Sequence, residues 1–399
     1  MPLTLKDTVV LDLSQNIAGP YCAQLLGDFG AAVYKIERPQ GGDDVRRFAP
    51  MRDGTSAAYF AFNRNKKSAA IDITHPDGLE AVRRLAARAD VFIHSLKPSS
   101  ARERRLGYEE TAAVNSRIIY CAISGFGAVG PRGDLAAYDP LSQAYSGLVT
   151  LTGHPHGDPV RLAPPVVDMG CALWAFGGIM AGLLERISTG RGARIETSLV
   201  ETAVAWTTLH MAGFVATGKV PERSGSASPA AAPYEAFRTA DGWLMVAAGN
   251  DRLYRRLCEL LEAPELLEDS RFSTNSLRVA NRAALHELLE PRFKRHTTAH
   301  WFERLALAGV PASPLHTLDE VYRDEQVRAL KMLRTIDRPG EEKFEVVDIG
   351  LRFNGEKAHV GAPPPRLGEH TDETLSFAGY DAAQIAALKA AGAVLQHPT

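Results

Sequence analysis

Residues 9–37 read VVLDLSQNIAGPYCAQLLGDFGAAVYKIE, and this stretch indicates the fold. Val9–Leu13 is an apolar run of strand length, and after a turn-like segment apolar residues recur with helical spacing from Tyr21. Pro20 suits a first helical turn, because the N–H that proline lacks has no intrahelical partner there. Ala32–Glu37 then resumes a strand, so the stretch predicts a β-α-β unit.

The same alternation continues beyond this unit. Strands are expected at residues 68–73, 91–94 and 117–123, and a helix is expected from about Asp77 to Arg88. Strands that alternate with helices form a parallel sheet with helices on both faces. The expected fold class is therefore α/β.

A long helix is expected from Asp168 to about Ser188, with Gly190 as a left-handed C-terminal cap. As an N-cap, the Asp168 carboxylate would accept hydrogen bonds from the first-turn amides. An ionised, partly desolvated carboxylate can also attack a thioester carbonyl, so a structural and a catalytic interpretation both stand. The apolar run Met169–Leu184 is shorter than the roughly 20 residues that cross a bilayer, and it predicts a buried helix.

The domain organisation follows from a change in composition near residue 218. Residues 218–233 are small and rich in Ser, Ala and Pro, which is typical of a loop or boundary. A hairpin pattern with the turn Asp241-Gly242 and several amphipathic helices follow. We expect a large domain over 1–215, a smaller α+β domain over 216–330 and a C-terminal segment, 331–399, that returns to the large domain.

Charge and cysteine usage bound the class of protein. Lys and Arg number 45 and Asp and Glu 47, giving a formal charge of −2 that argues against a nucleic-acid partner. The N-terminus lacks the basic and apolar regions of a secretory signal, and we expect a cytoplasmic protein without a membrane partner. The cysteines form no C-x-x-C pair and suit a reducing compartment; they are Cys22, Cys121, Cys171 and Cys258.

Two motifs suggest sites that their surroundings do not support. Gly125–Gly130 matches G-x-G-x-x-G after a strand, but Pro131 follows where a helix should open, so a glycine loop is expected and not a dinucleotide site. His154 and His156 lie two residues apart, without a carboxylate or cysteine at ligand spacing, so no metal site is expected.

Six segments, in order along nearly the whole chain, resemble those of the class III CoA-transferases, the CaiB/BaiF family that includes formyl-CoA transferases and 2-methylacyl-CoA racemases. They are VLDLSQNIAGPYCAQLLGDFGAAVYKIERP (10–39), NRNKKSAAID (63–72), YDPLSQAYSG (138–147), PPVVDMG (164–170), STGRGARIETSL (188–199) and LGEHTDE (367–373). The resemblance implies a Rossmann-like large domain built from both termini, a small domain and an interlocked homodimer.

The resemblance also implies a set of site residues. The family nucleophile falls on Asp168 and a second acid on Asp139. Among the implied coenzyme A contacts, Arg38, Lys97 and Arg105 suit a ligand that carries a diphosphate and a 3′-phosphate. The full set of implied contacts is Gln15, Asn16, Ile17, Ala18, Arg38, Ile71, Ser95, Leu96, Lys97 and Arg105.

The implied activity is transfer of coenzyme A from an acyl-CoA, with succinyl-CoA as candidate donor, to a free carboxylic acid through an aspartyl-CoA thioester. Acyl-CoA is then a substrate, and neither a metal nor a permanently bound cofactor is expected. A short dicarboxylate such as itaconate, mesaconate, malate or glutarate is the expected acceptor, with Arg46, Arg47 or Arg52 placed to reach its second carboxylate.

Departures from the family pattern narrow the function. Ile17 stands where formyl-CoA:oxalate transferases carry glutamine, and residues 225–232 replace their glycine-rich lid, which argues against formyl-CoA and oxalate. Residues 225–232 are either a lid or a plain linker. Tyr138 stands where the racemases carry a catalytic histidine. A 2-methylacyl-CoA racemase or epimerase and a catalytically silent acyl-CoA-binding protein remain the alternatives.

Overall fold

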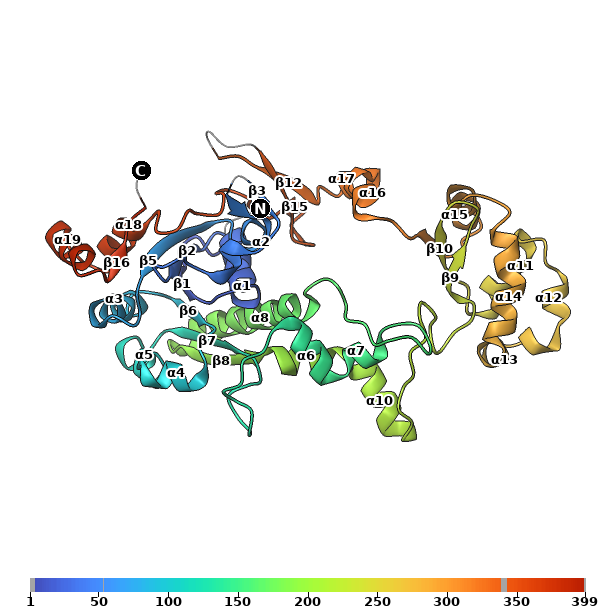
Figure 1. Cartoon of the computed structure of the whole chain (residues 1–399), viewed down its shortest axis with the longest axis horizontal. Coiled ribbons are helices and arrows are strands. Elements are labelled where there is room, and N and C mark those ends of the chain that lie inside the picture. The colour runs from blue at the N-terminus through green and yellow to red at the C-terminus, as the bar shows by residue number, and fades with distance from the viewer. Residues whose placement is uncertain (1–3, 53, 339–342, 398–399) are drawn as a thin grey trace. The chain divides into compact units, whose positions relative to one another are not determined.

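The computed structural model describes residues 4–52, 54–338 and 343–397. Contacts between residues divide the chain into two compact units (Figure 1). The large unit comprises Met1–Leu148, Arg161–Gly213 and Gln326–Thr399, and the small unit comprises Val149–Val160 and Phe214–Glu325.

One segment differs from the domain limits expected from sequence. The large domain expected over residues 1–215 does not include Val149–Val160, which belongs to the small unit. Gly225 N donates to Gly153 O at 2.9 Å, and the Arg223 side chain donates to the carbonyls of His154 and Gly157. These contacts join two pieces of chain whose sequence patterns show no relation.

The large unit is built on a seven-stranded sheet with strand order β16-β5-β2-β1-β6-β7-β8. All neighbouring strands pair in parallel except β16, which pairs with β5 antiparallel. The α/β fold class is thereby confirmed. The strands are β1 (Val9–Leu13), β2 (Ala32–Glu37), β5 (Lys66–Ile71), β6 (Val91–His94), β7 (Ile119–Ser124), β8 (Ala193–Ser198) and β16 (Val394–Leu395).

Helices cover both faces of this sheet. Successive strand residues point to opposite sides, and apolar residues on both sides need a cover. Val10 packs into the core shared with α1, α8 and α9, whereas Leu11 packs into the core shared with α3, α5, α18 and α19. The helices of the large unit include α1 (Ala18–Asp28), α2 (Ala57–Phe62), α3 (Pro76–Ala86), α4 (Pro98–Glu103), α5 (Tyr108–Val114), α6 (Asp139–Ser146), α8 (Val166–Thr189), α9 (Leu199–Trp206), α18 (Thr371–Phe377) and α19 (Ala382–Ala390).

Helix α8 is the long helix expected from the sequence. Gly190 ends it in the left-handed conformation, with φ of 68°. By length and composition α8 would suffice to cross a membrane, and α9 with α10 (Thr208–Thr217) forms a bent apolar pair. One side of α8 is buried in the large-unit core through Cys171, Ala175 and Ile179.

The small unit combines a three-stranded sheet with helices. The expected hairpin is present: β9 (Tyr234–Arg238) pairs with β10 (Trp243–Ala247), and Thr239 N donates to Gly242 O across the turn. Strand β11 (Ala312–Pro314) completes the sheet. The helices are α11 (Asp251–Leu260), α12 (Glu265–Glu268), α13 (Asn275–Ala280), α14 (Arg282–Phe293), α15 (Thr298–Leu307) and α16 (Leu318–Arg323).

The C-terminal part of the chain adds short hairpins to the large unit before it reaches the main sheet. Strand β12 (Leu333–Ile336) pairs with β13 (Phe344–Val347), and β14 (Arg352–Phe353) pairs with β15 (Glu356–Lys357). Strand β16 then lies against β5, so the last described residues close one edge of the sheet.

Candidate active site

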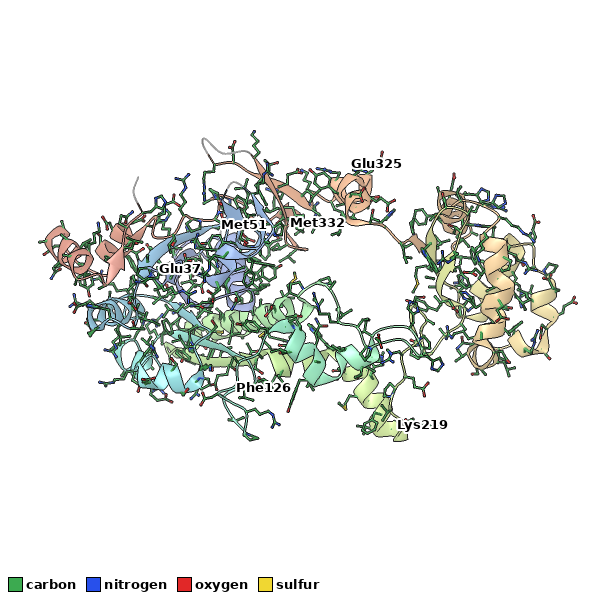
Figure 2. All side chains as sticks on the ribbon, in the orientation of Figure 1. Glu37, Met51, Phe126, Lys219, Glu325 and Met332 are labelled. Atoms are coloured by element: carbon green, nitrogen blue, oxygen red, sulfur yellow. The ribbon has the colours of Figure 1, made fainter. Side chains whose placement is uncertain are left out.

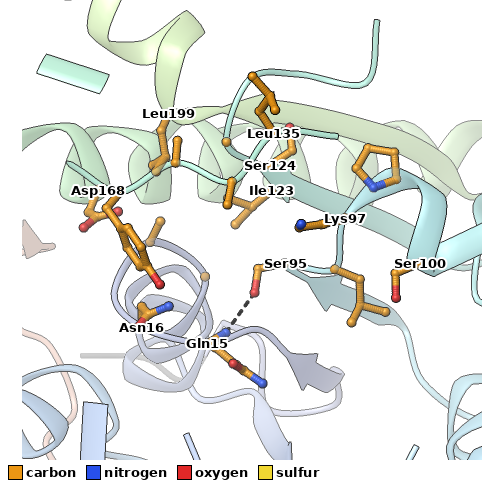
Figure 3. Close-up of a pocket in the computed structure, with 18 of the residues that line it drawn as sticks. Gln15, Asn16, Ser95, Lys97, Ser100, Ile123, Ser124, Leu135, Asp168 and Leu199 are labelled. Carbon is orange, nitrogen blue, oxygen red and sulfur yellow. Dashed lines mark hydrogen bonds between the residues drawn. The ribbon is translucent and has the colours of Figure 1, made fainter. Parts of the chain in front are cut away.

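A cavity of about 420 Å³ lies at the carboxyl ends of β1, β6 and β7 (Figure 3). The strand order runs outward from β1 in one direction and from β6 in the other, so this is the topological switch point of the sheet. Ligands of open α/β sheets bind in the crevice at such a point, because the loops there diverge to opposite faces. Of the expected site residues, the cavity lining includes Gln15, Asn16, Ala18, Ser95, Leu96, Lys97 and Asp168.

The loop after β1 forms one wall of the cavity and is held from below by buried charges. Asn16, at φ of 65°, donates its N–H to Asp43 Oδ1 at 3.0 Å. Asp43 Oδ2 pairs with Lys35 Nζ at 2.9 Å, and Lys35 Nζ donates to Ser14 O at 3.0 Å. The ion pair therefore fixes the loop backbone at two points.

A second ion pair extends this arrangement. Lys66 Nζ lies 3.0 Å from Asp12 Oδ2, and Asp12 Oδ1 accepts from the backbone and hydroxyl of Ser14. Burial lowers the pKa of Lys66 to about 8 even beside Asp12. We call Asp12, Lys35, Asp43 and Lys66 the β1 charge cluster; the side chains of all four are fully buried.

The loop after β6 forms the facing wall and is held by a histidine. Leu96 N donates to His94 Nδ1 at 3.1 Å, so the ring proton lies on Nε2, which is 2.6 Å from the Tyr120 hydroxyl. Burial lowers the pKa of His94 to about 4, which keeps the ring neutral. Gln15 N donates to Ser95 Oγ at 3.0 Å and joins the two walls (Figure 3).

The start of α8 shows that Asp168 is not an N-cap. Pro165 occupies the N-cap position, and Asp168 is the third helical residue. The amides of Val167 and Asp168 donate to Asp139 Oδ2 at 2.8 and 3.2 Å, so Asp139 caps the helix from α6. The expectation that first-turn amides stabilise the Asp168 carboxylate is wrong, because the amides of Val167 and Asp168 donate to Asp139 instead.

Asp168 is thus a partly buried carboxylate that receives no hydrogen bond within the described chain. Burial, and secondarily the negative charge of Asp139, raise the pKa of Asp168 to about 7. A desolvated carboxylate without donors is a stronger nucleophile once ionised, because no hydrogen bond must be broken before it attacks. Its side chain lies at the cavity lining opposite Lys97 (Figure 3).

The other expected contact residues lie outside this cavity lining. Ile17 is the N-cap residue of α1, and Ile71 is a core residue beside β16. Arg38 follows β2 and pairs with Asp44, while Arg105 lines a separate cavity of about 170 Å³. Asp139 is also absent from the lining, because both its oxygens face α8 and Gln143.

The arginines expected to read a second carboxylate are engaged elsewhere. Arg46 forms a bidentate pair with Glu37 (labelled in Figure 2) at 2.7 Å and stacks on Tyr59. Arg47 pairs with Asp44 at 2.6 Å. Arg52 lies over the ring of Phe344. None of the three lines the cavity, so the expectation drawn from their position in the sequence finds no support in this geometry.

Residues 225–232 are not a loose linker within the small unit. Asn275 Oδ1 accepts from Ala232 N, and Arg282 donates to the carbonyls of Ser228 and Ala231. Arg278 donates to Ala232 O from a fully buried position. Side chains of α13 and α14 therefore hold this segment against its own unit.

The structure also describes the glycine motif of residues 125–130 and the histidine pair. No helix opens after β7; instead Gly125 approaches the Ala137 backbone so closely that a Cβ would lie 2.7 Å from Ala137 N. The glycine-loop interpretation is confirmed. In residues 4–52, 54–338 and 343–397 no three His, Cys, Asp or Glu side chains gather as a metal site.

Sequence reasoning missed the residues that hold the site. Asp12 and Lys35 are charged residues inside largely apolar strands, and that pattern is the signal that would have marked them. Lys66 begins β5 and is followed by Lys67, so it has no such signal. His94 and Gln143 have no comparable signal in the sequence, because a single histidine at the end of a strand and a glutamine in a polar helix are both common.

A family model described as CoA-transferase family III matches residues 5–371. The chain belongs to CoA-transferase family III. This family III enzyme is 39% identical to the succinyl-CoA:glutarate CoA-transferase of Mus musculus, over 99% of this chain and 91% of that protein. It is 34% identical to the succinate–glutarate CoA-transferase of Agrobacterium fabrum, over 92% and 94% of the two chains.

A solved structure agrees with this family III assignment. The crystal structure of a CaiB/BaiF family protein from Brucella suis superposes with a TM-score of 0.85 and 36% identity, covering 95% of this chain and all of that chain. Membership across nearly the whole chain confirms the enzymatic class, so the protein is a CoA-transferase that uses CoA thioesters as substrates.

Proposed function

We propose that this family III CoA-transferase moves coenzyme A from succinyl-CoA to glutarate or a similar short dicarboxylate, with Asp168 as the residue that carries the coenzyme. The carrying observation is the Asp168 carboxylate: it lines the cavity, no described group donates to it, and its pKa is raised to about 7 by burial and by Asp139. The names of the Mus musculus and Agrobacterium fabrum relatives support the substrate pair.

In the proposed reaction the Asp168 carboxylate attacks the thioester carbonyl of succinyl-CoA and expels the CoA thiolate, leaving a mixed anhydride. The thiolate then attacks the aspartyl carbonyl, which releases succinate and forms an aspartyl-CoA thioester. Glutarate attacks that thioester and the same two steps run in reverse. One thioester is exchanged for another, so no net proton, metal or nucleotide enters the balance.

The same proposal gives roles to other residues of the cavity lining. Lys97 supplies a cation that suits a phosphate of coenzyme A, and the loops after β1 and β6 offer backbone N–H groups and the polar side chains of Gln15, Asn16 and Ser95. Arg38, which follows β2, and Arg105, which lines the separate cavity, are proposed as further cations for the phosphates of the coenzyme.

We further propose a cytoplasmic homodimer. The outer side of α8 supports this, because Leu173 and Trp174 are each 53% exposed and Leu184 and Ile187 are 70% and 83% exposed. Apolar side chains in such a row suit a protein partner. Light scattering should report about twice 43.2 kDa, and an active monomer at micromolar concentration would contradict it.

An acceptor screen with succinyl-CoA, read by mass spectrometry of the CoA esters, tests the proposed function. Glutarate should yield glutaryl-CoA and an equal amount of succinate, and acetate should serve as a poor acceptor. Exchange of deuterium at C2 of a 2-methylacyl-CoA without any acceptor would instead indicate a racemase. Binding of succinyl-CoA without exchange into any acid would indicate a silent binding protein.

A further inference from the structure

Gln143 on α6 is a fully buried amide that links its own helix to the segment before α8. Its Oε1 accepts from Leu162 N at 2.9 Å, which fixes the orientation of the amide. Its Nε2 donates to Asp139 Oδ1 at 2.6 Å and to Leu162 O at 3.2 Å. The Gln143 side chain therefore joins the segment that leads into α8 to the Asp139 carboxylate one turn earlier on α6.

Asp139 passes this constraint on to α8. Its Oδ2 accepts from the amides of Val167 and Asp168, so the backbone of Asp168 is bonded directly to the Asp139 carboxylate. With Oδ1 taken by Gln143, neither oxygen of Asp139 is directed at the cavity. An acid in this position is placed to act through the helix and through its charge.

We propose that Gln143 is a positioning residue for CoA transfer: it holds the Asp139 carboxylate against the amides of Val167 and Asp168, and so fixes the place of Asp168 and of the negative charge beside it. This inference rests on Asp168 being the nucleophile. Without the Gln143 amide, the Asp139 carboxylate can rotate away from α8, and the helix amides lose their acceptor.

Other charges near this site do not replace that arrangement. Glu201 on α9 is bonded to Ser198, and Arg161 donates to the carbonyls of Leu162 and Ala163. Burial and the charge of Asp139 are the two causes that raise the pKa of Asp168. Movement of Asp139 away from α8 therefore lowers the pKa of Asp168. A substitution that only destabilises the fold leaves this pKa unchanged.

The test compares Gln143→Leu, Asp139→Asn and the double variant in transfer from succinyl-CoA between pH 5.5 and 8.5. Groups that orient a reactive residue typically carry about 10- to 100-fold of activity, so Gln143→Leu should lower kcat by that factor while KM for succinyl-CoA stays within about twofold. The acid limb of the wild-type profile should have its midpoint near pH 7, and in both single variants that midpoint should move to lower pH. The double variant should be no slower than Asp139→Asn, because both changes remove one linkage.

Gln24→Leu is the matched control, since Gln24 is also fully buried and also accepts from a backbone N–H, that of Arg64. It should leave the midpoint of the acid limb at the wild-type value. Additive losses in the double variant, an unmoved midpoint, or a Gln143→Leu profile equal to that of Gln24→Leu would overturn the proposal. Gln143→Asn, whose shorter amide cannot reach both partners, is measured in parallel and judged by the same criteria if Gln143→Leu does not fold.

Borohydride trapping of the wild-type enzyme with succinyl-CoA separates this inference from the assignment on which it rests. A label on an acid other than Asp168 overturns the nucleophile and the inference together. A label on Asp168 combined with additive losses overturns the role of Gln143 alone.

Discussion

The β1 charge cluster lies beneath the loop that forms one wall of the cavity, and the acid pair at the start of α8 places Asp168 on its lining; the two groups treat buried charge in opposite ways. In the cluster each of the two lysines has a carboxylate partner within 3.0 Å. At α8, one acid receives all the available hydrogen bonds and Asp168 receives none. Paired buried charge holds one wall of this site in place, while the unpaired carboxylate of Asp168 is the group proposed as nucleophile.

The largest expected effect is the loss of catalysis when Asp168 is replaced. Asp168→Asn keeps the shape of the side chain but removes the nucleophile, and transfer should fall by roughly 10³-fold or more. Borohydride should inactivate the wild type only when succinyl-CoA is present, by reducing the aspartyl thioester to an alcohol on the peptide that contains Asp168. A variant that still transfers at near the wild-type rate would break the assignment.

The next effect is on stability in the β1 charge cluster. Asp43→Ala leaves Lys35 buried without its nearest carboxylate and frees the Asn16 amide, so we expect a loss of about 3–5 kcal/mol in the free energy of unfolding. Asp44→Ala is the control next in sequence, because the Asp44 carboxylate is 40% exposed and its ion pairs should contribute about 0–1 kcal/mol. Urea unfolding measures both, and equal losses would mean that pairing in the cluster carries no special weight.

The smallest effect has the opposite sign. A carboxyl whose pKa is raised from 3.8 to about 7 on folding binds its proton more tightly in the folded state, so its contribution to stability falls as pH rises from 4 to 7. Asp168→Asn should therefore match the wild type near pH 4 and exceed it by about 1–2 kcal/mol at pH 8. Thermal unfolding at both pH values checks this, and a variant less stable at pH 8 would show that Asp168 is a stabilising acid after all. No N-cap is lost in this variant, because Asp139 accepts from the amides of Val167 and Asp168.

The sequence predicted the sheet well, because apolar runs and helical spacing in residues 9–37 reflect local preferences that the fold keeps. It predicted Gln15, Asn16, Lys97 and Asp168 at one cavity through a family resemblance, and the structure brings them together. It failed where the decisive contact joins distant residues: an Asp before an apolar helix has the pattern of an N-cap, and nothing local shows that Asp139 arrives from another helix. The same reason hid Val149–Val160, which contacts the segment around Gly225 in the small unit.

The pairing of β16 with β5 also has a consequence for synthesis of the chain. Ala70 N donates to Thr371 Oγ1 across 301 residues of sequence, and the strand that closes this edge follows still later. At about 5–20 residues per second, a ribosome needs roughly 15 to 60 s to make the intervening chain. For that time the growing polypeptide exposes the outer edge of β5 and the apolar surface that Leu375, Ile385 and Leu388 later cover. An unpaired strand edge is a template for association with other chains, so chaperone occupancy during translation, more than stability after release, should set the yield of folded enzyme.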